Sequence, residues 1–205
     1  RGYWVHSVKV GGDVDQNIER IQDVETHRPT KERILYDANR GFTRQQALRV
    51  MQATEQWKVM FEQPCETLDD IAAIRPLHSA PVSVDECLVT LQDATRVARD
   101  GIAEVFGIKL NRVGGLTKAS RIRDIALAHG IDIFVMATGG SVLADTEALH
   151  LAATIPDDNM LGVWACQDMI TAEIADGAGP RANNGHLHLP EQPGLGVHPQ
   201  ESTLT

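Results

Sequence analysis

Acidic residues end three strand-like runs of the chain at nearly equal spacing. They are Asp37 in RILYDAN, Glu62 in KVMFEQP and Asp85 in PVSVDEC, and the gaps between them are 25 and 23 residues. Lysines continue the spacing on both sides: Lys9 precedes the first acid by 28 residues, and Lys109 follows the last by 24. Each gap has room for one strand, one helix and two short loops. Five residues at this spacing predict a divalent-metal site with flanking bases.

The residue types indicate which chemistry such a site could perform. Mg²⁺ takes oxygen ligands, and Asp37, Glu62 and Asp85 offer three carboxylates. No histidine or cysteine has metal-ligand spacing, which argues against zinc. Lysine can act as a general base, so Lys9 and Lys109 could remove and return a proton on opposite faces of a substrate. For each acid taken singly, capping of the next helix is the alternative explanation.

Strand-like runs and helical patterns alternate along the chain and must position these residues. Short runs of Val, Ile, Leu and Phe are typical of buried parallel strands. The predicted strands are 7–10, 33–37, 58–62, 82–85, 105–109, 132–136 and 161–164. The predicted helices are 13–27, 43–56, 67–74, 91–99, 116–129 and 141–154, and Thr43 is an expected N-cap.

Seven strand–helix units without a hairpin signal predict an α/β fold with a parallel sheet. A (β/α) TIM-type barrel accounts for the strand-end chemistry, because functional groups of barrels gather at the C-terminal ends of the strands. An open doubly wound sheet is the alternative, but the chain has no GxGxxG motif. Since a full barrel has eight strands, we expect one more strand before Arg1. The barrel should span residues 1–175, and residues 176–205, rich in Gly, Pro, Asn and His, should form an irregular tail in which HLHLP is a candidate strand.

Composition excludes some classes of protein. The 205 residues carry a net charge of −9, and no basic cluster indicates a nucleic-acid partner. No apolar run reaches the roughly 18 residues of a membrane span. Three widely separated cysteines do not form a disulfide framework, so we expect a reducing, cytoplasmic location.

The motifs SVKVGG, YDANRGF, FEQPC, VDEC and IKLNRVGGLTKA, in this order, resemble the barrel domain of the enolase superfamily, in its mandelate racemase/muconate lactonizing enzyme branch. The resemblance runs from Val5 to Trp164. It implies one Mg²⁺ per active site, held by the three acids, and abstraction of the proton α to a carboxylate by the two lysines. One departure is Ser7, where the branch usually has the first lysine of a Lys-x-Lys motif.

Together, SVKVGG, FEQPCETLDDIAAIR, VMATGG and VWACQ are similar to the branch members that act on proline derivatives. This similarity implies dehydration of cis-3-hydroxy-L-proline or a related compound, and racemisation or 2-epimerisation of proline or hydroxyproline betaine is the alternative. A small carboxylate would be the substrate. Trp164, Asn39 and Thr138 are candidate substrate contacts: Trp164 by cation–π packing, and Thr138 as part of a small uncharged patch. For Asn39, capping of the loop is the competing role, and for Trp164 it is core or interface packing.

In the resembled family an N-terminal capping domain closes the site, and we expect the 205 residues to lack it. A second hypothesis is therefore a non-catalytic fragment or binding module. The exposed barrel helices favour a homo-oligomer in the full-length protein.

Overall fold

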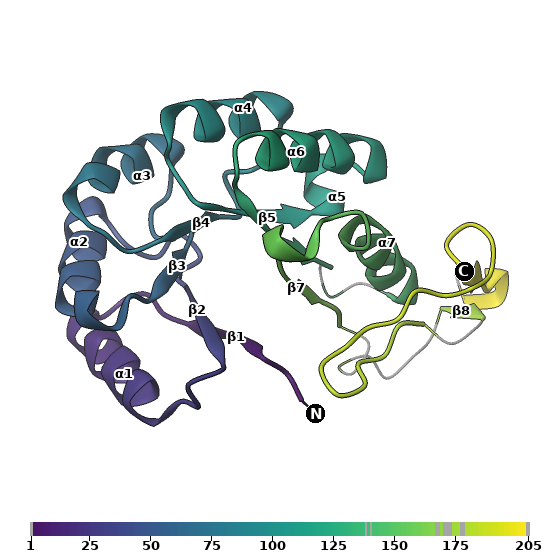
Figure 1. Ribbon diagram of the computed structural model, residues 1–205, viewed down its shortest axis with the longest axis horizontal. Coiled ribbons are helices and arrows are strands. Elements are labelled where there is room, and N and C mark those ends of the chain that lie inside the picture. The colour runs from purple at the N-terminus through teal and green to yellow at the C-terminus, as the bar shows by residue number, and fades with distance from the viewer. Residues whose placement is uncertain are drawn as a thin grey trace. The chain divides into compact units, whose positions relative to one another are not determined.

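The computed structural model describes residues 2–137, 139, 141–166, 169, 174–176 and 179–203. Its main sheet has seven strands that follow one another in chain order, from β1 to β7 (Figure 1). They are β1 (Val5–Lys9), β2 (Arg33–Asp37), β3 (Met60–Glu62), β4 (Val82–Val84), β5 (Val105–Lys109), β6 (Asp132–Met136) and β7 (Met160–Trp164).

The strand order decides between the two predicted architectures. The neighbouring strands β1 to β5 pair in parallel, and so do β6 and β7. A doubly wound sheet would reverse its order at a switch point. The order found here never reverses, which is the winding of a (β/α) barrel and not of an open doubly wound sheet.

Helices connect the successive strands, and most begin where the sequence indicated. They are α1 (Val14–His27), α2 (Arg44–Ala53), α3 (Leu68–Ile74), α4 (Leu91–Asp100), α5 (Leu110–Val113), α6 (Leu116–Ala128) and α7 (Val142–Ala152). Thr43, Thr67 and Thr90 are N-caps whose side chains accept a hydrogen bond from a main-chain N–H of the first turn. Threonine is therefore the signal that starts three of the helices.

Side chains alternate between two faces of the strands, and large buried side chains lie on the face covered by helices. Tyr36 and Phe61 pair in register, are fully buried and have ring centroids 6.2 Å apart. The Tyr36 hydroxyl donates a hydrogen bond to Glu25 of α1 at 2.8 Å, so this face is turned toward the helices. Figure 1 shows α1 to α4 on the same side of β1 to β4. The residues that follow, Asp37 and Glu62, project to the opposite face.

Contacts divide the chain into two compact units. The first unit is Trp4–Phe106, and the second comprises Arg1–Tyr3 and Gly107–Thr205. The first holds β1 to β4 with α1 to α4. In the second, α7 packs on β6 and β7, and a buried cluster of Val142, Ala175 and Val197 joins α7 to the later part of the chain.

Several boundaries differ from the sequence prediction, and one predicted strand does not form. Strand β1 runs from Val5 to Lys9 and not over 7–10, and α7 ends at Ala152 and not at residue 154. The helix predicted over 43–56 ends at Ala53, and a separate 3₁₀ turn, η1 (Glu55–Trp57), follows it. Lys58 has φ 52° and so cannot begin β3, which starts at Met60. HLHLP is not a strand: only an isolated bridge from Asn183 to His186 forms there, and the short pair β8 (Ala175–Asp176) and β9 (His198–Pro199) lies on either side of it in sequence.

Candidate active site

Three of the five predicted residues are neighbours in the sheet. Lys9, Asp37 and Glu62 are the last residues of β1, β2 and β3. The parallel register pairs Lys9 with Asp37 and Asp37 with Glu62. Paired residues of adjacent strands project to the same face of a sheet. The structure therefore brings these three side chains together at one edge, as the spacing predicted.

Asp85 follows the last residue of β4 and completes the set of acids. Glu62 pairs with Ser83, and Asp85 lies two residues beyond Ser83 in the chain. Asp37, Glu62 and Asp85 retain only 3%, 2% and 0% of their exposure. Burying ionised carboxylates is costly unless positive charge or hydrogen bonds compensate. Three buried carboxylates therefore lie at this end of the first unit.

Lys9 supplies one positive charge to this group. Its Nζ donates to Asp37 Oδ2 and, at 2.7 Å, to Asn39 Oδ1. The main-chain N–H of Asn39 donates to Asp37 Oδ1 at 2.8 Å, and Asn39 Nδ2 donates to Glu86 Oε1 at 2.9 Å. Asn39 has φ 43°, a conformation that asparagine tolerates better than most residues. The Lys9 side chain keeps 58% of its exposure, so its amine is accessible from solvent.

The three acids match Mg²⁺ in donor chemistry. Mg²⁺ prefers oxygen ligands and often takes only one or two carboxylates together with water. Within the described ranges, no three His, Cys, Asp or Glu side chains are grouped as ligands of a metal ion. The ammonium of Lys9 contacts Asp37 instead. Donor type and burial thus fit Mg²⁺, and the assignment of Asp37, Glu62 and Asp85 as its ligands stays a prediction.

Lys109 is the last residue of β5 and belongs to the second unit. It is half-buried, and α5 begins at the next residue. Its place at the C-terminal end of a strand is the one that the sequence predicted. Its role as a base stays a prediction.

The three residues predicted to contact the substrate differ in what the structure describes of them. Trp164 ends β7 and is 36% exposed, and its carbonyl accepts a hydrogen bond from the Ala137 N–H at 2.9 Å. Thr138 lies outside the described residues. Asn39 binds Lys9 and Glu86, as described above, which is a contact that the sequence did not indicate.

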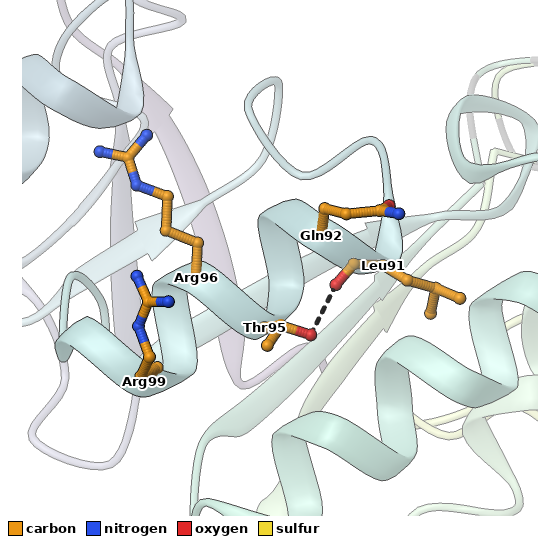
Figure 2. Close-up of a pocket in the computed structure, with 5 residues that line it drawn as sticks. All are labelled: Leu91, Gln92, Thr95, Arg96 and Arg99. Carbon is orange, nitrogen blue, oxygen red and sulfur yellow. Dashed lines mark hydrogen bonds between the residues drawn. The ribbon is translucent and has the colours of Figure 1, made fainter.

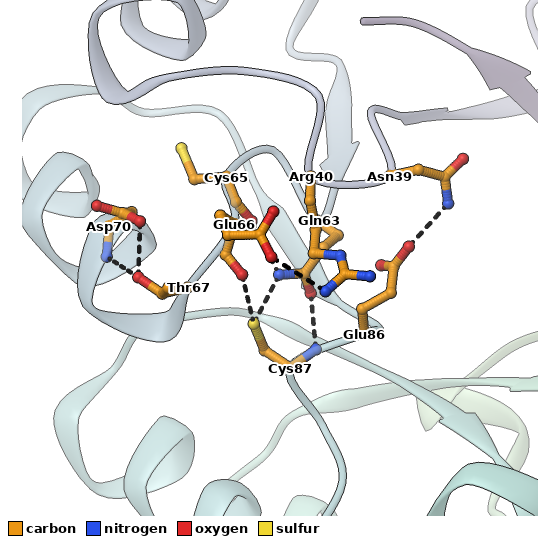
Figure 3. Close-up of polar contacts among 9 residues, drawn as sticks. All are labelled: Asn39, Arg40, Gln63, Cys65, Glu66, Thr67, Asp70, Glu86 and Cys87. Atoms are coloured by element: carbon orange, nitrogen blue, oxygen red, sulfur yellow. Dashed lines mark hydrogen bonds and ion pairs between the residues drawn. The ribbon is translucent and has the colours of Figure 1, made fainter.

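Gln63, which lies between Glu62 and Pro64, was not among the predicted site residues. Gln63 is fully buried and has φ 39°, and its amide bonds to Cys65, Asp85 and Cys87. Figure 3 shows the contact with Cys87. A polar residue between a strand-end acid and a proline was the available signal. The hydrogen bonds of Gln63 could not be predicted from that signal, because the loops that supply its partners come together only in the folded chain.

The three cysteines are free thiols. Burial raises the pKa of Cys65 to about 11, and the Asp70 carboxylate adds to the increase. Burial also raises the pKa of Cys87 and of Cys166. Thiols with raised pKa values stay protonated near neutral pH and react slowly.

A hollow of about 350 Å³ lies on α4 and is lined by residues of that helix alone (Figure 2). Its two cations already have partners: Arg96 binds Asp69 of α3, and Arg99 binds Asp100 at 2.7 Å. These hydrogen bonds raise the pKa of both guanidinium groups. None of the predicted site residues lines this hollow.

In the part of the chain that the structure describes, no helix has the length and apolarity needed to cross a membrane.

Residues 1–203 match the family described as enolase C-terminal domain-like. A cis-3-hydroxy-L-proline dehydratase from Roseibium aggregatum is 33% identical over 198 residues, which are 97% of this chain and 54% of that protein. Other curated relatives are named as epimerases or racemases: L-Lys-D/L-Arg epimerase, N-succinylamino acid racemase and L-Ala-D/L-Glu epimerase. The chain spans about half the length of the curated relatives it matches.

Solved structures give the same result for the fold. A Silicibacter pomeroyi protein described as a mandelate racemase/muconate lactonizing enzyme is 77% identical, with a TM-score of 0.95 over 99% of this chain and 56% of that one. An enolase-superfamily member from Roseovarius nubinhibens, crystallised with magnesium, is 38% identical, with a TM-score of 0.93 over 98% of this chain and 55% of that one. The predicted (β/α) barrel class and the resemblance stated from the motifs are both confirmed.

Proposed function

Because the chain belongs to the enolase C-terminal domain-like family, we propose that it carries the catalytic residues of an enzyme that removes the proton α to a carboxylate. The observation that carries this proposal is the register of Lys9, Asp37 and Glu62, with buried Asp85 after the next strand. It unites a base and three potential metal ligands at the ends of adjacent strands. The substrate would be a small, proline-like carboxylic acid.

In this proposal Asp37, Glu62 and Asp85 hold Mg²⁺. The bound ion would place positive charge beside the substrate carboxylate, where negative charge builds up as the α-proton leaves. A magnesium complex of a 38% identical relative supports the choice of metal. The grouping of three buried carboxylates at the ends of neighbouring strands also supports it, because Mg²⁺ prefers oxygen ligands.

Lys9 and Lys109 are the proposed bases. Lys9 is accessible and is held at two points, by Asp37 and by Asn39. Lys109 ends its own strand in the second unit. Two bases from different strands would let one lysine take the α-proton while the other delivers a proton elsewhere on the substrate.

Dehydration of cis-3-hydroxy-L-proline is the reaction we propose first. One lysine takes the α-proton, the bond from C3 to its hydroxyl oxygen breaks, and a proton from a lysine accompanies the leaving hydroxyl as water. A double bond forms between the α-carbon and C3. The 33% identical relative named for this reaction supports the choice.

Epimerisation is the second candidate, and the same two lysines favour it. Removal of the α-proton by one base and its return from the opposite face by the other inverts the α-carbon. Several relatives are named as epimerases or racemases. The two reactions differ in product: dehydration releases water, whereas epimerisation leaves the mass unchanged.

The test is exchange of the substrate α-proton in deuterated water, measured by NMR with the full-length protein, Mg²⁺ and cis-3-hydroxy-L-proline or a proline betaine. We expect Lys109→Ala to lower the rate of exchange or turnover by about 10²- to 10⁴-fold, the usual contribution of a general base. Lys118→Ala, in α6, is the matched control and should behave as wild type. Exchange at the wild-type rate in Lys109→Ala would remove this residue from the mechanism.

A further inference from the structure

Gln63 occupies a backbone conformation that its residue type rarely adopts. It follows Glu62 directly, is fully buried and has φ 39°, in the left-handed region. A left-handed residue with a long side chain is strained and persists only where its surroundings impose it. Such positions are common at functional sites. The interactions of Gln63 therefore indicate what holds it there.

The side-chain amide of Gln63 reaches from the end of β3 to the loop after β4 (Figure 3). Its Oε1 accepts hydrogen bonds from the main-chain N–H groups of Asp85 at 3.0 Å and Cys87 at 3.2 Å. Its Nε2 donates to the Cys65 carbonyl at 3.0 Å and to Cys87 Sγ at 2.9 Å. Two main-chain donors require an oxygen acceptor, so the orientation of the amide is determined by its partners.

The main chain of Gln63 extends this connection to two further segments. Its N–H donates to the Ser83 carbonyl at 2.8 Å, and its carbonyl accepts from the Arg40 N–H at 2.8 Å. Gln63 thus bonds to the loop after Asp37 and to the loop after Asp85, while it follows Glu62 in the chain. One residue links the segments that carry all three buried acids.

From these contacts we propose that Gln63 is a positioning residue for the Mg²⁺ site. Its side chain fixes the main chain at Asp85, and its main chain fixes the neighbouring loops, so that the three carboxylates are held at a set separation. This inference rests on the proposed function, because it requires that these acids bind Mg²⁺. It adds a residue that contacts neither metal nor substrate and acts through Asp85. The competing explanation is that Gln63 only stabilises the loops.

Titration calorimetry with Mg²⁺ on the full-length protein separates the two explanations. Gln63→Asn keeps an amide and suits a left-handed backbone, but it is one methylene too short to reach Asp85. Gln63→Met keeps the length and removes every side-chain hydrogen bond. We expect both variants to bind Mg²⁺ about 10- to 100-fold more weakly than wild type, as for other residues that orient metal ligands.

Thr54→Val is the matched control for lost stability. Thr54 is also fully buried and donates to main-chain carbonyls, those of Val50 and Met51, but it follows α2 and has no contact with the acids. It should lower the melting temperature and leave the Mg²⁺ affinity unchanged. If Gln63→Asn folds and its Mg²⁺ affinity is within about twofold of the wild-type value, the inference is overturned. If Gln63→Asn does not fold, the Mg²⁺ affinity of Gln63→Met is judged by the same criterion.

Mg²⁺ binding by the wild type and by Asp85→Asn shows whether the inference about Gln63 fails alone or the proposed function fails with it. If the wild type binds Mg²⁺ and Asp85→Asn does not, the metal site stands and the Gln63 variants test the positioning role alone. Absence of Mg²⁺ binding by the wild type would overturn the proposed function, and the inference with it.

Discussion

Asn39 has two interpretations, and kinetics can separate them at the scale of the single residue. Its type and position after Asp37 suggested a substrate contact. The structure instead places its side chain between Lys9 Nζ, at 2.7 Å, and Glu86 Oε1, at 2.9 Å. Loss of a side chain that holds the base in place lowers kcat. Loss of a side chain that binds the substrate equally in its ground and transition states raises KM and leaves kcat unchanged.

We predict that Asn39→Gly lowers kcat by about 10- to 100-fold and leaves KM nearly unchanged, because misplacing a catalytic group by about 1 Å has an effect of this size. Glycine suits the positive φ of this position and removes both hydrogen bonds. Steady-state kinetics with the substrate identified by the exchange experiment measure both constants.

Asn184→Gly is the control for this variant. Asn184 is an exposed asparagine that also has a positive φ, of 50°, and it lies in the turn closed by Asn183 and His186. It should leave both constants at their wild-type values. A rise in KM with an unchanged kcat for Asn39→Gly would return Asn39 to the role of substrate contact.

At the scale of the element, the helices that follow the acids begin with well-formed caps. Thr90 and Asp93 form a capping box at the start of α4: Thr90 Oγ1 accepts from the Asp93 N–H at 3.1 Å, and the Asp93 carboxylate accepts from the Thr90 N–H at 2.8 Å. Both bonds satisfy N–H groups that the helix itself cannot. This cap defines where the loop after Asp85 ends.

We predict that Thr90→Ala lowers the free energy of unfolding by about 1 kcal/mol, the usual contribution of an N-cap side chain. Urea denaturation followed by circular dichroism measures the change. Thr95→Ala is the control in the same helix, since Thr95 Oγ1 donates only to the Leu91 carbonyl one turn earlier and caps nothing. Equal losses for the two variants would show that the cap adds no stability of its own.

At this scale the sequence was most informative. Thr43 was expected as an N-cap and forms a capping box with Gln46. Strands β2, β5 and β6 have the predicted bounds, because their apolar runs are flanked by charged or turn-forming residues. The end of α2 was missed because the 3₁₀ turn after it continues the helical pattern of the sequence, and only the left-handed Lys58 breaks it.

At the scale of the whole molecule, the three acids and Lys9 belong to the unit Trp4–Phe106, whereas Lys109 and Trp164 belong to the other. The proposed metal ligands therefore come from a single compact unit. Metal binding to a folded site stabilises it through mass action, since an unfolded chain does not present the ligands together. Mg²⁺ should thus raise the stability of the fold as well as enable the reaction.

We predict that free Mg²⁺ at 100 times its dissociation constant stabilises the protein by about 2.7 kcal/mol and that EDTA removes this gain. Differential scanning calorimetry in Mg²⁺ and in EDTA measures it. Asp85→Asn should melt at the same temperature in both buffers. Asp157→Asn, an exposed position in η3 (Asp157–Asn159), should respond to Mg²⁺ as the wild type does. A wild type that is indifferent to Mg²⁺ would contradict the proposed metal site.

The sequence alone determined the parallel α/β class and placed Lys9, Asp37, Glu62 and Lys109 at or next to the ends of strands. These features are local, because apolar runs, threonine caps and the length of one strand–helix unit repeat along the chain. Parallel winding then places successive strand ends beside one another. The register of Lys9 with Asp37 and of Asp37 with Glu62 follows from this repetition.

The tertiary structure alone decided the contacts of Gln63 and Asn39. Gln63 bonds to residues 22 and 24 positions away, and Asn39 bonds to residues 30 and 47 positions away. Both residues have a positive φ, which asparagine tolerates and glutamine rarely adopts. Hydrogen bonds between loops have no period along the chain. They can be known only when the folded backbone has brought those loops together.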